Sequence, residues 1–212
     1  MKKVINIVFL TFLVVFLSSS CSDDSTTAPN QSENLIPLKT GNYWELKISE
    51  HYEGDYEWQG RKFKIGKEKK VNGENFYEFI VVYITRDKLV EDYGYDKYSR
   101  DTVYIRKGDE GYYINNEEYT YLFLKYPIEP GDSWTIISPS ETDTVKCISK
   151  NINVATPIDN YECISYKLSG SPSPFVDAKY YISKGIGFIG EVEGGLNDYK
   201  DRKRLLNSYN LE

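Results

Sequence analysis

Two cysteines in this sequence could be joined by a disulfide. Cys147 and Cys163 lie in neighbouring strand-like runs, 144–149 and 161–168, which are connected by a loop around Pro157. In an oxidising compartment, an even pair of cysteines on adjacent strands can form a bridge that stabilises the fold by about 3 kcal/mol. The alternative is two buried thiols that pack as small hydrophobic groups. The sequence leaves both open, because adjacent strands bring two cysteines within bonding distance only in the right register.

A second group with binding chemistry is the cluster Tyr93, Tyr95, Asp96 and Tyr98. Tyrosine rings stack on the faces of sugars and a carboxylate accepts hydrogen bonds from hydroxyl groups, so the cluster suits a carbohydrate. The competing explanation is chance, because the chain contains 20 tyrosines and tyrosine is common in strands. We expect this segment to be a loop or the end of a strand.

The sequence shows no recognisable catalytic or metal-binding motif. His51 is the single histidine and lies in a polar turn, with no serine motif, metal-ligand spacing or glycine-rich phosphate loop around it. Carboxylates are plentiful, but a glycosidase pair cannot be recognised without its spacing in three dimensions. We therefore predict no catalytic residue, no metal site and no cofactor.

A dense basic run spans 61–70 and could bind an anionic glycan. However, Phe63 and Ile65 alternate with Lys62 and Lys64, which favours a half-buried strand with a lysine-rich solvent face. Lysines in such a strand would also protect a sheet edge from unwanted pairing. The 212-residue chain carries a formal net charge of −6, which argues against a nucleic-acid partner because phosphate binding needs a basic surface.

The first twenty residues have the features of a secretion signal. Lys2 and Lys3 precede an apolar stretch at 4–17, which is shorter than the roughly 20 residues of a spanning helix. The following Leu-Ser-Ser-Ser-Cys resembles the lipobox of bacterial lipoproteins. This resemblance implies that 1–20 is a signal peptide and that Cys21 becomes the lipidated first residue of the mature chain. The alternative is an ordinary secretory signal cleaved near Ser20.

The residues after Cys21 have the composition of a tether. Residues 22–34 contain no aromatic residue and only one aliphatic residue, Ala28, so we expect 21–35 to comprise the lipidated cysteine and a flexible tether. Ser-Asp-Asp at 22–24 resembles the acidic signal that directs such lipoproteins to the outer face of the outer membrane, although a plain polar linker has the same composition. We predict a lipid-anchored outer-membrane protein, whose domain faces either the periplasm or the cell exterior.

The mature chain has the pattern of an all-β protein. From Tyr43 onward, runs rich in Tyr, Ile, Val, Phe and Thr are separated by Gly, Asn, Asp and Pro about every eight to twelve residues. This pattern predicts one β domain at 36–212, an antiparallel meander of about 10–12 strands that forms a sandwich or a half-open barrel.

One hairpin can be placed with its register. Asn72-Gly73 is a strong signal for a two-residue turn. Such a turn would place Lys67 opposite Glu78, and Ile65 opposite Ile80.

The sequence also contains a faint internal repeat. Pro-Leu-Lys-Thr-Gly-Asn-Tyr-Trp at 37–44 matches Pro-Ile-Glu-Pro-Gly-Asp-Ser-Trp at 127–134. Two shorter matches keep the same order. The repeat indicates either duplicated halves, 36–125 and 126–212, or hairpins that share turn chemistry.

The repeated unit ends in a tryptophan in each half. Trp44 and Trp134 are expected to point into one continuous core, and a tryptophan platform for a ligand is the alternative.

The motif Pro-x-x-x-Gly-Asn/Asp-x-Trp in both halves resembles a broad group of uncharacterised, Bacteroidota-type exported lipoproteins. Thr-Pro-Ile-Asp-Asn-Tyr-Glu-Cys at 156–163 and Tyr-Tyr-Ile-Ser-Lys-Gly-Ile-Gly at 180–187 fit the same group. The resemblance implies an extracytoplasmic β domain attached to a membrane. It implies no particular activity.

Three functions are compatible with these features. The first is a lipid-anchored, non-enzymatic module of the cell envelope that binds a ligand or partner through strand-end loops. The second is a periplasm-facing, lipocalin-like carrier of an apolar ligand. The third is a glycan-binding or glycan-active surface protein, whose activity would need two carboxylates about 5–9.5 Å apart.

Overall fold

The computed structural model describes residues 34–48, 58–137, 142–171, 177–193 and 202–212. The predicted signal peptide, the lipidation site Cys21, almost all of the predicted tether and His51 lie outside the described residues. Ser32–Glu212 forms one compact unit. Leu35, which we had placed at the end of the tether, is fully buried beside Ile36, so the packed domain includes this residue.

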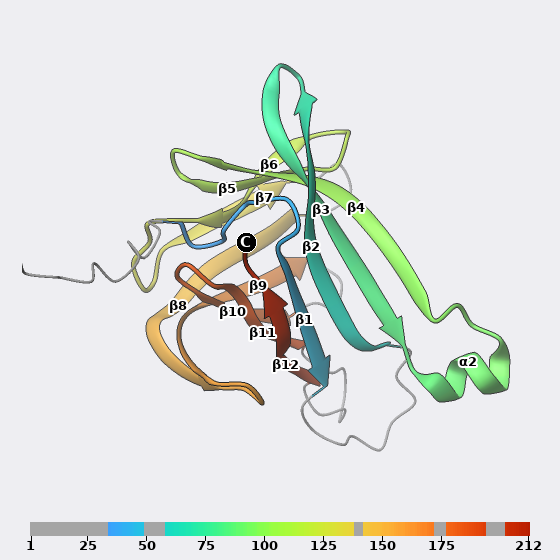
Figure 1. Cartoon of the computed structure of the whole chain (residues 1–212). Helices are drawn as coiled ribbons and strands as arrows, with labels where there is room; N and C mark the ends of the chain where they lie inside the picture. Colours follow the sequence, from blue (N-terminus) through green and yellow to red (C-terminus); the bar gives the residue numbers. More distant parts are fainter. Residues whose placement is uncertain (1–33, 49–57, 138–141, 172–176, 194–201) are drawn as a thin grey trace, which may run out of the picture. The chain divides into compact units, whose positions relative to one another are not determined.

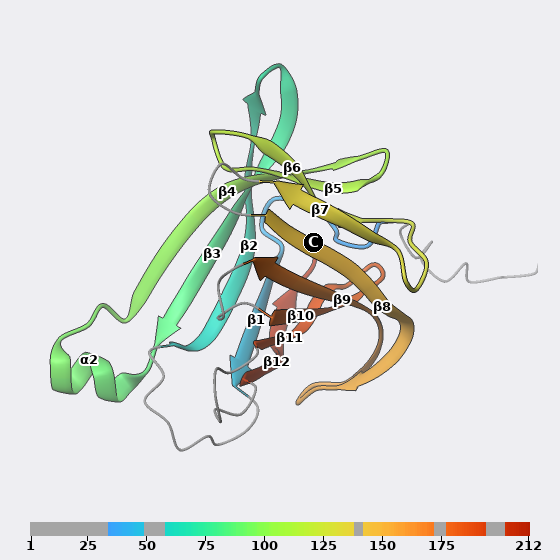
Figure 2. The same ribbon diagram turned by 180° about the vertical axis from the view of Figure 1, so that it is seen from behind.

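The described part of the chain is built almost entirely of strands (Figure 1). A short helix, α2 (Asp87–Tyr93), connects β3 to β4 and projects from the sheet in both views (Figures 1 and 2). The strands are β1 (Tyr43–Ile48), β2 (Trp58–Val71), β3 (Glu74–Thr85), β4 (Tyr98–Gly108), β5 (Gly111–Asn115), β6 (Thr120–Lys125), β7 (Ser133–Ile137), β8 (Thr142–Ala155), β9 (Asn160–Ser171), β10 (Asp177–Ser183), β11 (Gly187–Glu193) and β12 (Arg202–Asn210).

All twelve strands belong to one antiparallel sheet with the order β6-β5-β4-β3-β2-β1-β12-β11-β10-β9-β8-β7. Each half of the chain is a six-stranded meander, and the pairing of β1 with β12 joins the two halves. The sheet curls so that β2–β4 and β8–β10 lie on opposite sides of a nearly closed barrel (Figures 1 and 2). The prediction of an all-β antiparallel meander is confirmed, and of the two expected forms the structure has the barrel.

The hairpin between β2 and β3 follows the predicted register only near its turn. Asn72 and Gly73 have φ values of 52° and 86°, as a tight hairpin turn requires. A bulge lies between Ile65 and Glu68, and beyond it Ile65 is opposite Phe79. The predicted partner, Ile80, is wrong by one residue.

Gly66 explains where the bulge falls. A side chain on Gly66 would collide with Glu78, while the backbone N–H of Lys67 donates to the Glu78 carboxylate at 3.1 Å. Two residues of β2 therefore face one residue of β3, which bends the strand.

The basic run occupies β2 as a half-buried strand. Phe63 and Ile65 are buried and Lys64 is exposed, as the alternation predicts. The proposed protection of a sheet edge is wrong, because β2 lies between β1 and β3. Arg61 has the same orientation as Phe63 and points into the barrel.

The repeated motif docks onto the sheet in the same way in both halves. In each half, the backbone N–H of the motif's glycine donates to the carbonyl of one residue on the next long strand. The carbonyl of the following Asn or Asp accepts from the backbone N–H of that same residue. Both glycines have φ near +100°. The bonds are Gly41 N–H to Ile65 O and Ile65 N–H to Asn42 O, and Gly131 N–H to Cys147 O and Cys147 N–H to Asp132 O. The boundary between 36–125 and 126–212 falls between β6 and β7, so each half supplies one meander.

Aromatic rings fill the barrel interior around Trp44. Trp44 is fully buried, as predicted, and its indole N–H donates to the carbonyl of Ile186 at 2.5 Å. Phe188 lies with its ring centroid 5.6 Å from that of Trp44 and 4.5 Å from that of Phe63. Phe79 stacks on Phe63 at 5.6 Å, so four strands contribute to one aromatic cluster.

The tryptophan of the second repeated unit links the two ends of the sheet. Trp134 of β7 is half-buried, and its indole N–H donates to the carbonyl of Leu122 in β6 at 2.8 Å. The hydroxyl of Tyr166 similarly donates to the carbonyl of Lys125 at 3.1 Å. Both carbonyls belong to β6, which is an end strand of the sheet. Because side chains occupy them, this edge is less available for pairing with another chain.

Replacing Gly187 by alanine should destabilise the fold more than the same change at Gly131. Both glycines have φ of 98°, where a Cβ costs about 1–2 kcal/mol. At Gly187 the new Cβ would also lie 2.7 Å from the Trp44 ring, whereas nothing lies within 4 Å at Gly131. The clash should add about 1–3 kcal/mol. The free energies of unfolding of G187A and G131A can be compared by urea unfolding. Equal losses in the two variants would show that Trp44 does not pack against Gly187.

Candidate functional site

The structure places the predicted tyrosine cluster on an exposed surface at α2. Tyr93, Tyr95 and Tyr98 have exposures of 69%, 49% and 61%, and the ring centroids of Tyr93 and Tyr95 are 6.3 Å apart. Asp96 is exposed beside them. We call these four residues the tyrosine surface. Residues 94–97 form a loop and Tyr98 begins β4, as predicted, whereas Tyr93 is the last residue of a short helix that the sequence did not predict.

Backbone interactions hold the tyrosine surface in place. The helix ends at Tyr93, and the next residue, Gly94, caps it in a left-handed conformation with φ of 72°. This conformation turns the chain between Tyr93 and Tyr95. Thr85 is buried, and its hydroxyl donates to the carbonyl of Asp96 at 2.6 Å. The N–H of Thr85 donates to the carbonyl of Lys97 at 3.0 Å. The exposed rings thus lie on a segment tied to the end of β3.

Exposed carboxylates lie beside the rings of the tyrosine surface. Glu91 and Asp92 are exposed on α2, and Asp96 adds a third exposed carboxylate. The same segment also carries cations: Lys97 forms an ion pair with Asp87, and Arg100 is exposed on β4. The combination can stack on an apolar ring face and accept hydrogen bonds from hydroxyl groups.

The two candidate disulfide cysteines are both free and buried. They lie on the adjacent strands β8 and β9, but Cys147 is opposite Tyr166, and Cys163 is opposite Ile152. The register therefore separates them along the strands, and the buried-thiol alternative describes the structure. Burial, with a smaller contribution from Glu162, raises the pKa of the Cys163 thiol to about 12, so this thiol is protonated at neutral pH.

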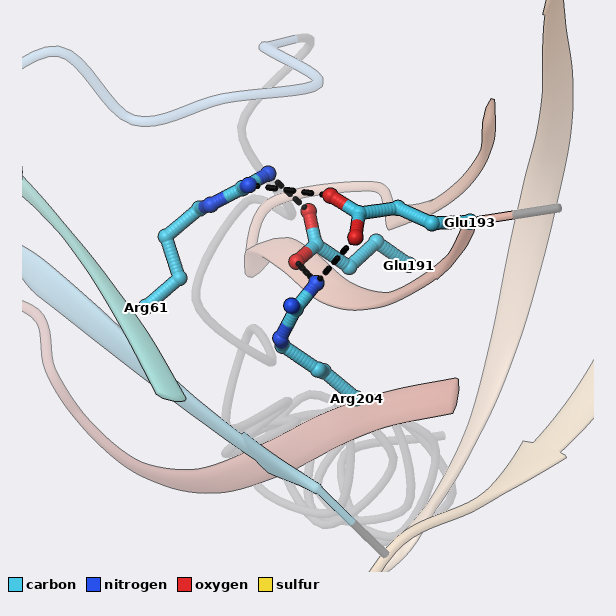
Figure 3. A network of polar contacts seen from close by, with 4 residues as sticks. All are labelled: Arg61, Glu191, Glu193 and Arg204. Carbon is cyan, nitrogen blue, oxygen red and sulfur yellow. Dashed lines mark hydrogen bonds and ion pairs between the residues drawn. The ribbon is translucent and has the colours of Figure 1, made fainter. Parts of the chain in front are cut away.

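A network of four charged side chains inside the barrel was not foreseen from the sequence (Figure 3). Arg61 comes from β2, Glu191 and Glu193 from β11, and Arg204 from β12. We call these four residues the Arg–Glu network. The Arg204 side chain is 1% exposed and that of Glu191 is 0% exposed, whereas Arg61 and Glu193 retain 15% and 25%.

Each carboxylate in the Arg–Glu network bridges both guanidinium groups (Figure 3). Glu191 accepts from Arg61 Nη1 and from Arg204 Nη1, both at 2.7 Å. Glu193 accepts from Arg61 Nη2 at 2.9 Å and pairs with Arg204 Nη1 at 3.0 Å. Two positive and two negative charges therefore balance in the interior.

The sheet register explains how the Arg–Glu network assembles. Glu191 and Arg204 are direct partners across the β11–β12 pair. Arg61 reaches them from beyond β1, which lies between β12 and β2 in the sheet. Burial alone would lower the pKa of Arg61, but Glu191 and Glu193 raise it overall, so the guanidinium stays charged.

Two tyrosines border the Arg–Glu network. The guanidinium of Arg61 lies 5.0 Å from the ring centroid of Tyr83. Tyr180 is opposite Glu191 in the β10–β11 pair. Burial, and then the nearby Glu191 carboxylate, raise the pKa of Tyr180, so its hydroxyl remains protonated.

Three nitrogens of the Arg–Glu network have no hydrogen-bond partner in the described structure although they are buried. They are Nε of Arg61, and Nε and Nη2 of Arg204. The network thus has donors left over after its internal pairs are made. The sequence contained one indication of this network. Arg61 lies two and four positions before the buried Phe63 and Ile65, so the strand alternation places its side chain on the same, inward face.

Within the described ranges, no group of three or more His, Cys, Asp or Glu side chains is arranged to hold a metal ion. No helix in that part of the chain is long and apolar enough to cross a bilayer.

Comparison with solved structures finds two proteins of similar architecture. One, from Bacteroides fragilis, is described as an exported protein with a YmcC-like fold. It has a TM-score of 0.47 and 11% identity, with coverage of 83% of this chain and 98% of that chain. The other, from Parabacteroides distasonis, is described as a lipoprotein. It has a TM-score of 0.44 and 11% identity, with coverage of 84% and 98%. No protein-family model and no curated protein matches the chain.

Replacing Glu191 by glutamine should destabilise the fold strongly. Removing one charge from a buried pair leaves its partners uncompensated, which costs about 3–5 kcal/mol. The matched control is Glu74→Gln, because Glu74 is 54% exposed and pairs with Arg106 at the surface. We expect the control to change the free energy of unfolding in urea by about 1 kcal/mol or less. Equal losses for E191Q and E74Q would show that the Arg–Glu network is not a major contributor.

Stability should fall as the pH rises from about 10 to about 12. Burial raises the pKa of Tyr112 to about 12, and burial does the same for Tyr121. A tyrosine in the unfolded chain ionises near pH 10, so between these values the folded state binds more protons and loses stability with rising pH. Tyrosinate absorbance should therefore rise in two phases, the second together with loss of circular dichroism. A single reversible phase near pH 10 with intact dichroism would contradict this assignment.

Proposed function

We propose that this protein is a lipid-anchored module of the bacterial cell envelope that binds carbohydrate through its tyrosine surface without catalysing a reaction. The observation that carries the proposal is the grouping of three strongly exposed tyrosine rings on one fixed segment. Clustered exposed aromatic side chains are typical of interaction sites, because they leave apolar area in water until a partner covers it.

The balanced charges around the tyrosine surface favour a neutral glycan as ligand. Residues 86–100 carry four acidic and four basic residues, so this surface has no excess charge to attract a charged polymer. The carboxylates of Glu91, Asp92 and Asp96 can accept hydrogen bonds from sugar hydroxyls. The rings of Tyr93 and Tyr98 can stack on the C–H faces of pyranose rings. The chain's net charge of −6 is in keeping with this preference.

The proposed attachment depends on the N-terminal sequence. An acylated Cys21 would hold the domain at the outer membrane, and the predicted tether would keep it away from the lipid surface. Several acyl chains on one residue anchor a protein firmly, whereas a single chain binds only marginally.

Two other functions fit the described structure less well. A carrier of an apolar ligand needs interior space, but the packed rings of Trp44, Phe63 and Phe188 occupy the interior around them. A glycosidase needs one carboxyl group free to give a proton. Glu191 and Glu193 instead accept hydrogen bonds from arginines, so neither carboxyl group is free.

Replacing Tyr93 or Tyr98 by alanine should weaken binding to a neutral polysaccharide about five-fold each, since one aromatic contact is worth about 1 kcal/mol. Affinity electrophoresis in gels containing dextran, mannan, xylan or laminarin measures this effect. Tyr209→Ala is the control, because Tyr209 is exposed on β12. The proposal fails if no polysaccharide of the panel retards the protein, or if Y209A weakens binding as much as Y93A.

Replacing Cys21 by alanine should abolish incorporation of labelled palmitate and release the protein from the membrane fraction, because the thiol is the proposed acylation site. Labelling of the unchanged protein and of C147A provides the comparison. Palmitate incorporation by C21A would contradict the proposed anchor.

A further inference from the structure

We propose that the free edge of β4, at residues 98–103, binds an extended polypeptide segment of another protein as an additional antiparallel strand. This site uses the backbone of β4 rather than aromatic rings, and it shares only Tyr98 with the tyrosine surface. It does not rest on the carbohydrate binding proposed above.

The first half of β4 has a neighbouring strand on one side only. β3 pairs with β4 from Tyr98 to Ile105, whereas the pairing of β5 with β4 begins at Tyr104. Within the described ranges, no strand pairs with the other edge of residues 98–103. The side chains at all five positions 98–102 are exposed, so both faces of the strand meet water here. In both views this half of β4 lies between α2 and the barrel (Figures 1 and 2).

The hydrogen-bond pattern shows which backbone groups point to the free edge. The N–H of Thr85 donates to the carbonyl of Lys97 directly opposite, and the register from there to residue 105 has no bulge. In an antiparallel pair, alternate residues bond to the partner strand, so residues 99, 101 and 103 bond to β3. The N–H and C=O groups that point away from β3, to the free edge, are those of Tyr98, Arg100 and Thr102.

This edge is suited to receive a strand. An unpaired edge is a template for strand addition unless proline, a bulge or a covering element protects it. Residues 98–103 contain no proline, and their register with β3 is unbroken. Tyr98, Thr102 and Val103 have side chains that favour strands. Because β3 already holds the edge extended, an added peptide would not have to order it, which lowers the entropic cost of binding.

The charged side chains of the edge select the partner. Arg100 and Asp101 are adjacent and exposed, and the Asp101 carboxylate also interacts with the hydroxyl of Tyr83. Residues directly opposite each other in a pair lie on the same face, where opposite charges stabilise and like charges destabilise the pair. A partner strand should therefore carry an acidic residue opposite Arg100 and a basic residue opposite Asp101. An aliphatic, β-branched residue fits opposite Tyr98 and Thr102.

A second copy of this chain is a poorer partner for the same edge. Two identical antiparallel strands are related by a twofold axis, which places one residue opposite its own copy. At the centre of this edge that residue is Arg100 or Asp101, so like charges would lie opposite each other. A partner with the charge order Lys-Glu, antiparallel to β4, avoids this repulsion.

The test is fluorescence anisotropy of a dye-labelled, end-capped peptide, Val-Lys-Glu-Thr-Val, titrated with the full chain in detergent. We expect this peptide to bind, and Val-Glu-Lys-Thr-Val to bind about ten-fold more weakly because both charge pairs become repulsive. N-methylation of the glutamate, which removes an N–H directed at Arg100, should weaken binding about ten-fold. N-methylation of the threonine, whose N–H points away from β4, should leave the affinity unchanged.

Variants of the chain test the same edge. Thr102→Pro removes an N–H that points to the free edge and no bond to β3, so it should weaken peptide binding about ten-fold or more. Thr102→Ala is the matched control and should bind as the unchanged protein does. If T102P fails to fold, Arg100→Glu provides a second test, because it should prefer Val-Lys-Lys-Thr-Val to Val-Lys-Glu-Thr-Val.

Controls separate this site from the tyrosine surface. Tyr93→Ala should leave peptide binding unchanged, and T102P should leave retardation by polysaccharide unchanged. The proposal is overturned if Val-Lys-Glu-Thr-Val does not bind, if the charge-exchanged peptide binds as tightly, or if folded T102P binds as T102A does. Sedimentation that shows a dimer separated by T102P would also overturn it, since the edge would then pair with a second copy.

Discussion

The antiparallel pairing of β1 with β12 is the interaction on which the rest of this structure depends. It is the strand pairing that joins the two meanders in the described sheet, and the chain itself connects them between β6 and β7. Trp44 lies on β1, and the arginines of the Arg–Glu network lie on the strands at either side of β1. The aromatic cluster and the buried charges therefore both require this one seam to be closed.

The second constraint is that four charges in the interior must neutralise one another. A buried ion pair is no guarantee of stability, because desolvation can outweigh the attraction between its members. Its geometry is nevertheless demanding, and Arg61, Glu191 and Arg204 meet only when β2, β11 and β12 have their observed positions. The network therefore ties the first meander to the second.

Features that depend on neighbouring residues could be predicted from the sequence. The turn at Asn72-Gly73, the alternation around Phe63 and the burial of Trp44 all follow from local patterns, and together they predicted an antiparallel meander. The tyrosine surface could be proposed because its residues are close in the chain. The duplication of the two halves remains a hypothesis, although the repeated hydrogen bonds at Gly41 and Gly131 are those it would produce.

Features that depend on distant contacts could not be predicted. The bulge at Gly66 arises from Glu78 on the partner strand, and this bulge changed the register of Ile65. Cys147 and Cys163 are on adjacent strands but out of register, which only the pairing of β8 with β9 reveals. Arg61 and Glu191 are separated by 130 positions in the sequence, and Arg61 stands in a run of otherwise solvent-directed lysines. The helix α2 is too short for a helical period to emerge from its sequence.

Amide hydrogen exchange tests most directly whether the seam between β1 and β12 holds the domain together. If it does, amides of β1, β11 and β12 should exchange most slowly, at a rate set by global unfolding, while amides of β6 and β7 at the ends of the sheet exchange through local opening. Rapid exchange in β1 and β12 alongside full protection of β6 and β7 would show that the barrel is held together elsewhere, and would contradict this account.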